Sequence, residues 1–480
     1  MNETIYVTTT IPYVNARPHV GFALELVQAD VVARYHRLLG RTVRFQTGTD
    51  ENAFKNVLTA RREGVSTGEF VDRNTAAFRE LVGALNASPD SFVRTTEDRH
   101  RRGVHALWRQ LRPEDLYLKS YRGLYCVGCE DFYLERDLVD GCCPDHEKPP
   151  VEVGEQNWFF RLSAYQSEIE DLLTGGRLRV LPEKRRNEVL SFVRRGLEDI
   201  SVSRLAERSG GWGISVPGDE AQVIYVWIDA LVNYLSGLGF GDGEDWRGFW
   251  NSDSRKIHVI GKNVWKFHAV YWPALLLSAG LPLPDELVVH GFLTENGRKI
   301  SKSLGNAIDP FECVARFGVD GVRYFLLRAV SPFDDGDFST ARLAERYRAD
   351  LANGLGNLVS RIASLCERAG FARSDRLPEP PAAPGGFHDA LEAYQYDRAL
   401  DLLWATVARL NQEIDHARPW ELLKSGAHAA LRERLAGWLR DLDAFAYWLA
   451  PFLPGTSIRI RHALSGSPVR RCEPLFPQVE

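Results

Sequence analysis

Short apolar runs and longer amphipathic stretches alternate near the start of the chain. The apolar runs are rich in β-branched residues at Ile5–Thr10 and Thr42–Thr47, and helical spacing follows at Leu24–Leu39 and Ser66–Leu85. This alternation predicts βαβ units and a parallel sheet. A segment rich in Gly, Cys and Pro, from Leu116 to Arg204, interrupts the pattern, which returns at Val223–Leu235, Lys256–Ile260 and Val288–Leu293. We therefore expect an α/β domain whose two halves are separated by an insert.

The chain after Phe311 is predicted to be helical. Its apolar residues recur at helical spacing and mark one buried face at Leu400, Leu403, Val407, Leu410 and Ile414. A linker rich in Pro and Ala, Leu377–Gly386, separates two helical stretches. Another helix is expected at Leu435–Leu453, before a basic tail.

Length, composition and charge define the broad class of protein. A chain of 480 residues is too long for one core, so several domains are expected. We find no apolar run of about 20 residues and no signal-peptide pattern, and we expect a cytoplasmic protein without a membrane partner. The formal net charge is -5, so any nucleic acid must be bound by local basic patches.

A cluster of cysteines in the insert predicts a metal site. Cys126 and Cys129 form one close pair, and Cys143 and His146 form a second. Two such pairs on separate turns are typical of a tetrahedral zinc knuckle, and four protein ligands leave no vacant position, so one structural Zn²⁺ is expected. Cys142 is a spare thiol that could compete as a ligand.

Two short segments carry residues that suit nucleotide chemistry. Pro18–Phe22 follows an apolar strand and opens a helix, where Gly21 allows close approach of an adenine ring and the helix N-terminus favours phosphate. Lys299–Ser303 places Lys299 and Lys302 in a loop, where they could clamp a polyphosphate. Together, and in this order, the two segments resemble the HIGH and KMSKS signatures of class I aminoacyl-tRNA synthetases.

The resemblance extends over nearly the whole chain. Five separate motifs match, in order, those of methionyl-tRNA synthetases. The chain resembles the compact kind, which ends after the anticodon-binding bundle. The resemblance implies a Rossmann-like nucleotide-binding domain split by a zinc-binding connective insert and followed by an α-helical bundle. The implied parts are 1–115 and 206–310 (catalytic), 116–205 (insert), 311–345 (stem contact) and 346–480 (anticodon binding).

The same resemblance implies a site for L-methionine. Asp50 would receive the substrate ammonium, and Trp227 would form an aromatic wall suited to a polarizable thioether. Tyr234 and His268 would place polar groups near the sulfur, and Arg204 would lie near the carboxylate. The implied set is Ile11, Tyr13, Asp50, Arg204, Trp227, Ala230, Tyr234, Val264 and His268. Taken singly, Trp227 and Tyr234 are more often core aromatics, and Asp50 a loop cap.

An ATP site with Mg²⁺ is implied as well. His19, Lys299 and Lys302 would act catalytically by stabilising charge on the transferring phosphates. The implied ATP-binding set is Pro12, His19, Gly21, Phe22, Asn263, Lys299, Ile300, Ser301 and Lys302.

In the helical part the resemblance implies anticodon readers for tRNA(Met). Trp420 would stack on an unpaired base, while Asn357 and Arg361 would hydrogen-bond base edges. No dimerisation domain is recognised after the bundle, so a monomer is expected.

Four residues depart from the family pattern. Phe22 replaces the second histidine of HIGH, Ile300 the Met of KMSKS, Asn52 a usual His beside Asp50, and Asn263 a usual Asp. A specialised, inhibitor-tolerant second copy would account for these changes and for the single methionine, Met1. Compositional bias is the simpler explanation of the single methionine. Two further alternatives are a paralogue that activates another amino acid or passes the aminoacyl group elsewhere, and an inactive tRNA-binding relic.

Overall fold

The computed structural model describes most of the chain. The described residues are 3–126, 131–133, 135–144, 147–243, 246–295, 297–300, 308–372, 380–466, 469–471 and 473–479, with backbone alone at Asp131, Phe132, Arg136 and Lys299. These residues form two compact units. The first comprises Met1–Pro18, Gly40–Glu80 and Pro89–Val289, and the second comprises His19–Leu39, Leu81–Ser88 and His290–Glu480.

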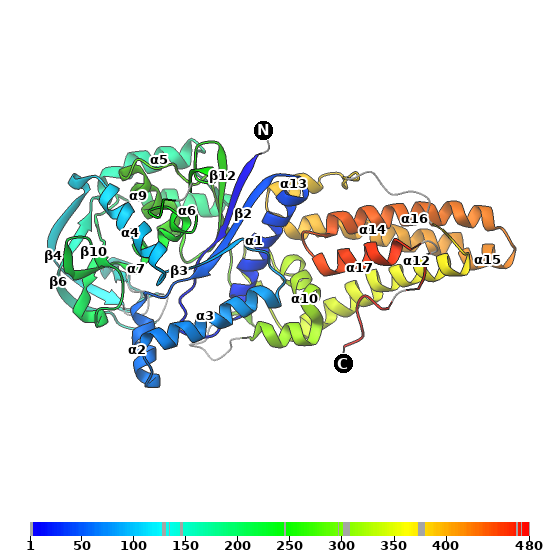
Figure 1. The fold of residues 1–480 in the computed structure, drawn as a ribbon, viewed down its shortest axis with the longest axis horizontal. Coiled ribbons are helices and arrows are strands. Elements are labelled where there is room, and N and C mark those ends of the chain that lie inside the picture. The colour runs from blue at the N-terminus through cyan, green and yellow to red at the C-terminus, as the bar shows by residue number, and fades with distance from the viewer. Residues whose placement is uncertain are drawn as a thin grey trace. The chain divides into compact units, whose positions relative to one another are not determined.

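A six-stranded sheet forms the centre of the first unit (Figure 1). Its order is β3 (Ser91–Arg94), β2 (Thr42–Thr49), β1 (Thr4–Thr9), β12 (Ser254–Gly261), β13 (Glu286–His290) and β7 (Arg179–Leu181). Thr4 of β1 is in parallel register with Thr42 on one side and Ser254 on the other. The prediction of a parallel sheet with two sequence halves is therefore confirmed. The edge strand β7 comes from within the interrupting segment, which the alternation of the sequence did not indicate.

Helices and one continuous core stabilise this sheet. The core joins Tyr6 and Ile260 of the sheet to Leu107 of α4, Leu235 of α8 and Leu275 of α9. The helices of this unit are α2 (Phe54–Glu63), α3 (Thr67–Ala84, whose last residues belong to the second unit), α4 (Asp98–Gln110), α5 (Gln166–Thr174), α6 (Glu183–Arg194), α7 (Val226–Leu231), α8 (Asn233–Ser236), a π-helical turn at Phe267–Tyr271 and α9 (Trp272–Ser278).

Two small antiparallel sheets complete the first unit. The larger has the order β5 (Asp131–Tyr133), β4 (Leu116–Cys126), β6 (Val151–Phe160) and β8 (Ile200–Ser201). The smaller has the order β10 (Ser215–Val216), β11 (Asp219–Ile224) and β9 (Ser203–Leu205). The segment predicted as an insert thus forms a β-structure of its own, apart from α5, β7 and α6.

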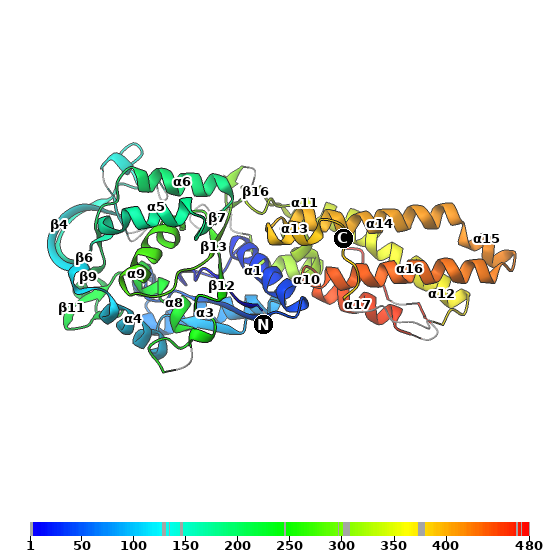
Figure 2. The same ribbon diagram turned by 90° about the horizontal axis from the view of Figure 1, so that it is seen from above.

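Helices dominate the second unit, as the sequence predicted. They are α1 (Val20–Leu38), α10 (Pro310–Arg328), α11 (Thr340–Arg346), a π-helical stretch at Tyr347–Gly356, α12 (Asn357–Arg368), α13 (Phe387–Glu392), α14 (Tyr396–Ala417), α15 (Pro419–Lys424), α16 (His428–Leu449) and α17 (Pro454–Leu464). A short sheet has the order β15 (Arg298–Lys299), β14 (Leu293–Glu295) and β16 (Gly336–Asp337). Figures 1 and 2 show α14 and α16 running side by side in the bundle.

The buried face of α14 is the one predicted, since Leu400, Leu403, Val407, Leu410 and Ile414 are all buried. The predicted helix Leu435–Leu453 differs at both ends. It begins earlier, at His428, because the exposed turn before Leu435 contains good helix formers, and it ends at Leu449, ahead of Pro451 and Pro454. None of the described helices is long and apolar enough to cross a membrane.

An internal ion pair ties helices of the second unit together. Arg323 of α10 is fully buried, and its guanidinium lies 2.8 Å from the carboxylate of Asp30 on α1. Burial alone would raise the pKa of Asp30, but Arg323 and Arg34 outweigh it and hold this pKa below its ordinary value. Arg323 also donates to the carbonyls of Leu85, Pro451 and Phe452, so each of its three nitrogens has a hydrogen-bond partner.

Candidate active site

The carboxyl ends of β1 and β2 bring the first predicted residues together. Tyr13, four residues after β1, bridges Asp50 directly after β2, and the Asp50 amide donates to the Pro12 carbonyl at 2.9 Å. Asp50 is 1% exposed and accepts at Oδ1 from the Asn52 amide at 3.2 Å. The carboxylate is therefore held at the sheet edge where parallel α/β sheets bind ligands.

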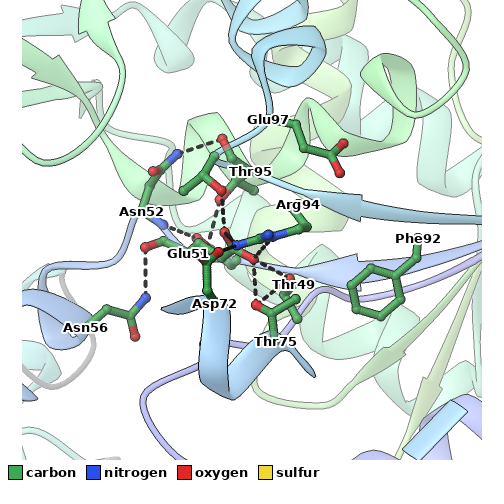
Figure 3. A network of polar contacts seen from close by, with 12 residues as sticks. Thr49, Glu51, Asn52, Asn56, Asp72, Thr75, Phe92, Arg94, Thr95 and Glu97 are labelled. Atoms are coloured by element: carbon green, nitrogen blue, oxygen red, sulfur yellow. Dashed lines mark hydrogen bonds and ion pairs between the residues drawn. The ribbon is translucent and has the colours of Figure 1, made fainter. Parts of the chain in front are cut away.

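The neighbour of Asp50, Glu51, is the centre of a buried polar network (Figure 3). Its carboxylate accepts two hydrogen bonds from Arg94, at 2.7 and 3.0 Å. It also accepts from the hydroxyls of Thr49 at 2.9 Å, Thr75 at 2.6 Å and Thr96. A fully buried carboxylate needs such partners to offset desolvation. Glu51 is thereby fixed, and it fixes the backbone that carries Asp50.

Asn52 connects the same strand end to a second part of the site. Its side-chain amide donates to Asp229 Oδ2 at 2.7 Å and to the Thr95 carbonyl at 3.1 Å. Asp229 in turn lies 2.7 Å from Nε2 of His100, whose Nδ1 lies 2.7 Å from the Ser236 hydroxyl. Asn52, which the sequence shows as a departure from the family, therefore has a defined buried partner.

Close approach of two helices makes this chain of contacts possible. A Cβ on Gly103 of α4 would lie 2.8 Å from the Cβ of Ser236 at the end of α8. Only glycine permits that distance, and it lets His100 reach Asp229 of α7.

Aromatic side chains surround the residues predicted to hold the methionine side chain. Trp227 stacks on Phe267, with ring centroids 4.0 Å apart and planes inclined by 7°, and it lies 5.7 Å from Tyr13. Ala230 follows one turn after Trp227 on α7 and is 5% exposed. The structure thus places Tyr13, Trp227 and Phe267 in one aromatic group; Phe267 was not predicted, although its place beside His268 could have indicated it.

Tyr234 and His268, both predicted to lie near the methionine sulfur, are in contact with one another. The Tyr234 hydroxyl lies 2.7 Å from Nε2 of His268, and Nδ1 of His268 lies 2.9 Å from the carbonyl of Val264. Because a carbonyl only accepts, Nδ1 carries a hydrogen and donates to Val264. Both rings are nearly fully buried.

A second histidine, His258 of β12, lies behind Tyr234 and was missed from the sequence. Its ring centroid is 4.1 Å from that of Tyr234, and its Nδ1 lies 2.6 Å from the Thr8 hydroxyl. Burial lowers the pKa of His258 well below its ordinary value, and the nearby His268 and Lys256 lower it further. The signal in the sequence was a lone histidine between the apolar residues Ile257 and Val259.

Arg204 of β9 is held by the backbone of its own region. Its Nη1 donates to the carbonyl of Ser203 at 2.8 Å and to the Ser201 hydroxyl at 3.0 Å, and its guanidinium lies 4.0 Å from the ring centroid of Tyr225. Arg204 and Tyr225 line a cavity of about 810 Å³ together with residues of β4, β6 and 195–201. Asn263 is exposed after the end of β12.

Apart from Pro18, the described residues of the two nucleotide signatures lie in the second unit. His19 is the N-cap of α1, and its Nδ1 accepts from the Gly21 amide at 3.0 Å. A Cβ at Gly21 would lie 2.8 Å from the His19 ring, so this cap requires glycine. Phe22 lies in the first turn of α1 and is partly buried.

Of the second signature, only the beginning is described. The backbone of Lys299 pairs with Thr294 of β14, and Ile300 is 4% exposed, with its amide donating to the Leu293 carbonyl at 3.0 Å. A buried apolar residue is thus well suited to the position where the family has methionine. Ser301, Lys302 and the side chain of Lys299 lie outside the described residues.

The predicted zinc knuckle is described in part. Cys126 at the end of β4 is 4% exposed and Cys143 is fully buried. The Glu147 amide donates to the Cys143 carbonyl at 2.8 Å. Cys129 and His146 lie outside the described residues, and within the described part of the chain no group of three or more potential ligands occurs. Two buried thiolate donors fit the predicted metal, and zinc remains a prediction.

The three predicted anticodon readers come together in the second unit. Asn357 and Arg361 of α12 and Trp420 of α15 all line one cavity of about 320 Å³. Arg361 is held by Asn411 at 3.3 Å and by Asp415 at 2.5 Å, both on α14. Trp420 remains 39% exposed, which is unusual for so large an apolar ring.

A comparison with protein families places this arrangement in a class. The family model described as "tRNA synthetases class I (M)" matches residues 5–149 and 145–363. The match covers both halves of the parallel sheet and the segment between them.

Individual relatives extend the likeness over almost the entire chain. A methionine–tRNA ligase of Brucella suis is 44% identical over 480 residues, which cover 96% of this chain and 92% of the relative. A methionine–tRNA ligase of Thermotoga maritima is 37% identical, with 99% of this chain and 80% of the relative covered. The chain belongs to the methionine–tRNA ligase family of class I tRNA synthetases.

Solved structures agree in fold. Mycobacterium tuberculosis methionyl-tRNA synthetase in complex with methionyl-adenylate matches with a TM-score of 0.89 and 39% identity, over 98% of this chain and 95% of that chain. A second structure of that enzyme, also bound by methionyl-adenylate, matches with a TM-score of 0.91 and 36% identity, over 99% of this chain and 100% of that chain.

Proposed function

We propose that the chain is an ATP-dependent ligase that activates L-methionine and transfers the methionyl group to tRNA(Met). The observation that carries the amino-acid specificity is the aromatic group Tyr13, Trp227 and Phe267 beside the buried Asp50. An apolar, polarizable thioether suits these rings, and a carboxylate at the strand end suits the substrate ammonium.

The reaction follows from what these groups can position. The methionine carboxylate attacks the α-phosphorus of ATP, pyrophosphate leaves, and the terminal ribose hydroxyl of tRNA then attacks the adenylate carbonyl as AMP leaves. Positioning and charge stabilisation dominate such chemistry, so no covalent enzyme nucleophile is needed. His19, Lys299 and Lys302 stabilise phosphate charge, while Asp50 and Arg204 orient methionine. Bound Mg²⁺ would neutralise part of the phosphate charge.

The remaining assignments follow the same proposal. Pro12, Gly21, Phe22, Asn263, Ile300 and Ser301 contribute to the ATP site, and Ile11, Ala230, Tyr234, Val264 and His268 to the methionine site. Parts 1–115 and 206–310 form the catalytic domain, 116–205 the insert, 311–345 the stem contact and 346–480 the anticodon-binding domain. The ligase acts in the cytoplasm.

ATP–pyrophosphate exchange tests this proposal directly. Exchange is measured with each of the twenty amino acids, and charging of tRNA(Met) is measured next. Exchange with methionine alone, followed by charging, supports the ligase. Exchange with another amino acid would show that the chain is a paralogue of different specificity. If an inhibitor that binds the methionine site does not lower the rate of charging, the result would favour a specialised, inhibitor-tolerant copy. No exchange, with tRNA still bound, would leave the inactive relic.

A structural Zn²⁺ in the insert is the second part of the proposal. Cys126, Cys129, Cys143 and His146 would hold it. We expect about one equivalent of zinc by elemental analysis of the purified chain. Cys126→Ser and Cys143→Ser should lose it, whereas Cys142→Ser, a matched change at the adjacent half-buried thiol, should retain it. Retention by all three variants would contradict the proposed ligand set.

A further inference from the structure

The cavity that holds the predicted anticodon readers contains two arginines that no prediction used. We call it the α12–α15 cavity; it is lined by Asn357, Ser360, Arg361, Ser364, Leu365, Arg368, Ile414, Trp420 and Arg471. Three of these nine residues are arginines, and none is acidic. In a chain of net charge -5, this is a local basic patch of the kind that nucleic-acid binding requires.

Arg471 reaches the cavity from the C-terminal tail. Val469 anchors the tail, because it is fully buried and its amide donates to the Phe371 carbonyl at 3.1 Å. Two residues later, Nε of Arg471 donates to the Ser364 hydroxyl on α12 at 3.0 Å. Ser364 and Arg368 are one helical turn apart, so Arg471 and Arg368 flank the same face of α12.

Arg368 and Arg471 differ from Arg361 in their pairing with carboxylates. Arg361 forms an ion pair with Asp415 on α14. Neither Arg368 nor Arg471 forms an ion pair with any carboxylate among the described residues. Both are exposed, so each guanidinium offers uncompensated positive charge at the cavity mouth.

The shape and chemistry of the cavity fit one nucleotide and its phosphates. A volume of about 320 Å³ accommodates a single base, and the half-exposed ring of Trp420 offers a stacking surface. Guanidinium groups bind phosphate through paired N–H donors. The absence of acidic lining residues argues against a cationic peptide as the occupant.

We propose that Arg368 and Arg471 bind the phosphates that flank the anticodon base stacked on Trp420, so that the C-terminal tail completes the anticodon site. This inference rests on the proposed function, since it takes the single-stranded anticodon loop of tRNA(Met) as the ligand. It assigns the tail a direct role in tRNA binding.

The test uses an RNA hairpin that carries only the anticodon arm of tRNA(Met), with the full-length chain. Binding is measured over a range of salt concentrations for the parent and for Arg368→Ala, Arg471→Ala and Arg471→Lys. Arg470→Ala is the matched control, because Arg470 is adjacent and exposed but does not line the cavity. Methionine-dependent ATP–pyrophosphate exchange is measured in parallel as a readout that does not involve the hairpin.

We expect each alanine variant to lose about tenfold in affinity, as the loss of one charge-assisted contact implies. The slope of log affinity against log salt should become shallower by about 0.7, the value for one phosphate contact with a single strand. Arg471→Lys should keep the parent slope, and Arg470→Ala should match the parent in both measures.

Equal behaviour of Arg471→Ala and Arg470→Ala would overturn the proposal. So would failure of the hairpin to bind a parent chain that performs exchange with methionine. If the hairpin binds as expected but no exchange occurs, the tail contact stands and the proposed ligase activity fails.

Discussion

Polar side chains are buried in the proposed methionine region, which comprises Asp50 and its neighbours, but several are exposed in the α12–α15 cavity. Around Asp50, the carboxylates Glu51 and Asp229 are fully buried, and each is satisfied by hydrogen bonds within the fold. In the α12–α15 cavity, Trp420, Arg368 and Arg471 are exposed. Under the proposed function, a small substrate would meet groups that folding has already fixed, and the cost of ordering them falls on stability. A large, flexible RNA would instead meet side chains that lie exposed at the surface. Substitutions in the first region should therefore affect both folding and catalysis, and those in the second should affect RNA binding alone.

Removal of the Asp50 carboxylate should have the largest effect. Loss of one partner of a desolvated charge pair costs about 2–5 kcal/mol, so Asp50→Asn should lower kcat/KM for methionine exchange roughly 30- to 4,000-fold. Steady-state exchange kinetics at saturating ATP measure this. Asp72→Asn is a control in the same region, because Asp72 pairs with Arg94 but is 66% exposed. An exposed pair contributes about 0–1 kcal/mol, so the control should retain most of the rate. Equal losses in the two variants would remove Asp50 from the ammonium site.

Trp420→Ala should have the next largest effect and should be confined to RNA. A base stacked on an aromatic ring is worth about 1–3 kcal/mol, so KM for tRNA in the charging reaction should rise roughly 5- to 150-fold. Methionine exchange without tRNA should remain unchanged. A matched change is Trp404→Ala on α14, where the ring is 8% exposed and packs in the core; this variant should instead lower the free energy of unfolding by about 3–5 kcal/mol. A fall in exchange for Trp420→Ala would contradict the separation of the two regions.

Asn52→Ala should affect folding and catalysis together, to a smaller extent. It leaves Asp229 without one of its hydrogen bonds, at a cost of about 1–3 kcal/mol in the free energy of unfolding. The backbone N–H of Asn52 that donates to Asp50 is kept in this variant, so only movement of the segment that the Asp229 contact holds in place reaches Asp50. We therefore expect a small rise in the KM for methionine and little change in the KM for ATP. Denaturant unfolding and exchange kinetics measure the two effects. A rise in KM for both substrates with unchanged stability would contradict a positioning role for Asn52.

The sequence predicted elements well where local pattern and motif order decide them, and less well where distant side chains pair. The strands β1, β2, β12 and β13 and the buried face of α14 follow from periodicity alone. Asp50 and Trp227 are predicted from motif order, and in the structure each lies beside Tyr13. The contact between Asn52 and Asp229 spans 177 residues, and the one between His100 and Asp229 depends on how closely α4 approaches α8 at Gly103. No pattern in the sequence encodes either contact. The sequence therefore showed Asn52 as a departure without showing its partner.

The smallest predicted effect concerns the buried His258 and the way in which the stability of the folded chain depends on pH. Burial holds its pKa well below the ordinary value in the folded chain, whereas in the unfolded chain this histidine titrates near pH 6.5. Below that pH the histidine is protonated in the unfolded state but not in the folded state, so it lowers the free energy of unfolding as the pH falls. Between pH 7.5 and 5.5 the contribution is about 1.4 kcal/mol. His258→Gln should lower stability at both pH values, because Thr8 loses a fitted partner, but its loss on acidification should be smaller than that of the parent by this amount. Urea unfolding of both proteins at the two pH values measures the difference, in which the other histidines cancel. If His258→Gln has the same pH dependence of stability as the parent, the interior of the methionine region tolerates a charged histidine. The polar groups of this region would then be less firmly fixed by the fold than the contrast with the α12–α15 cavity implies.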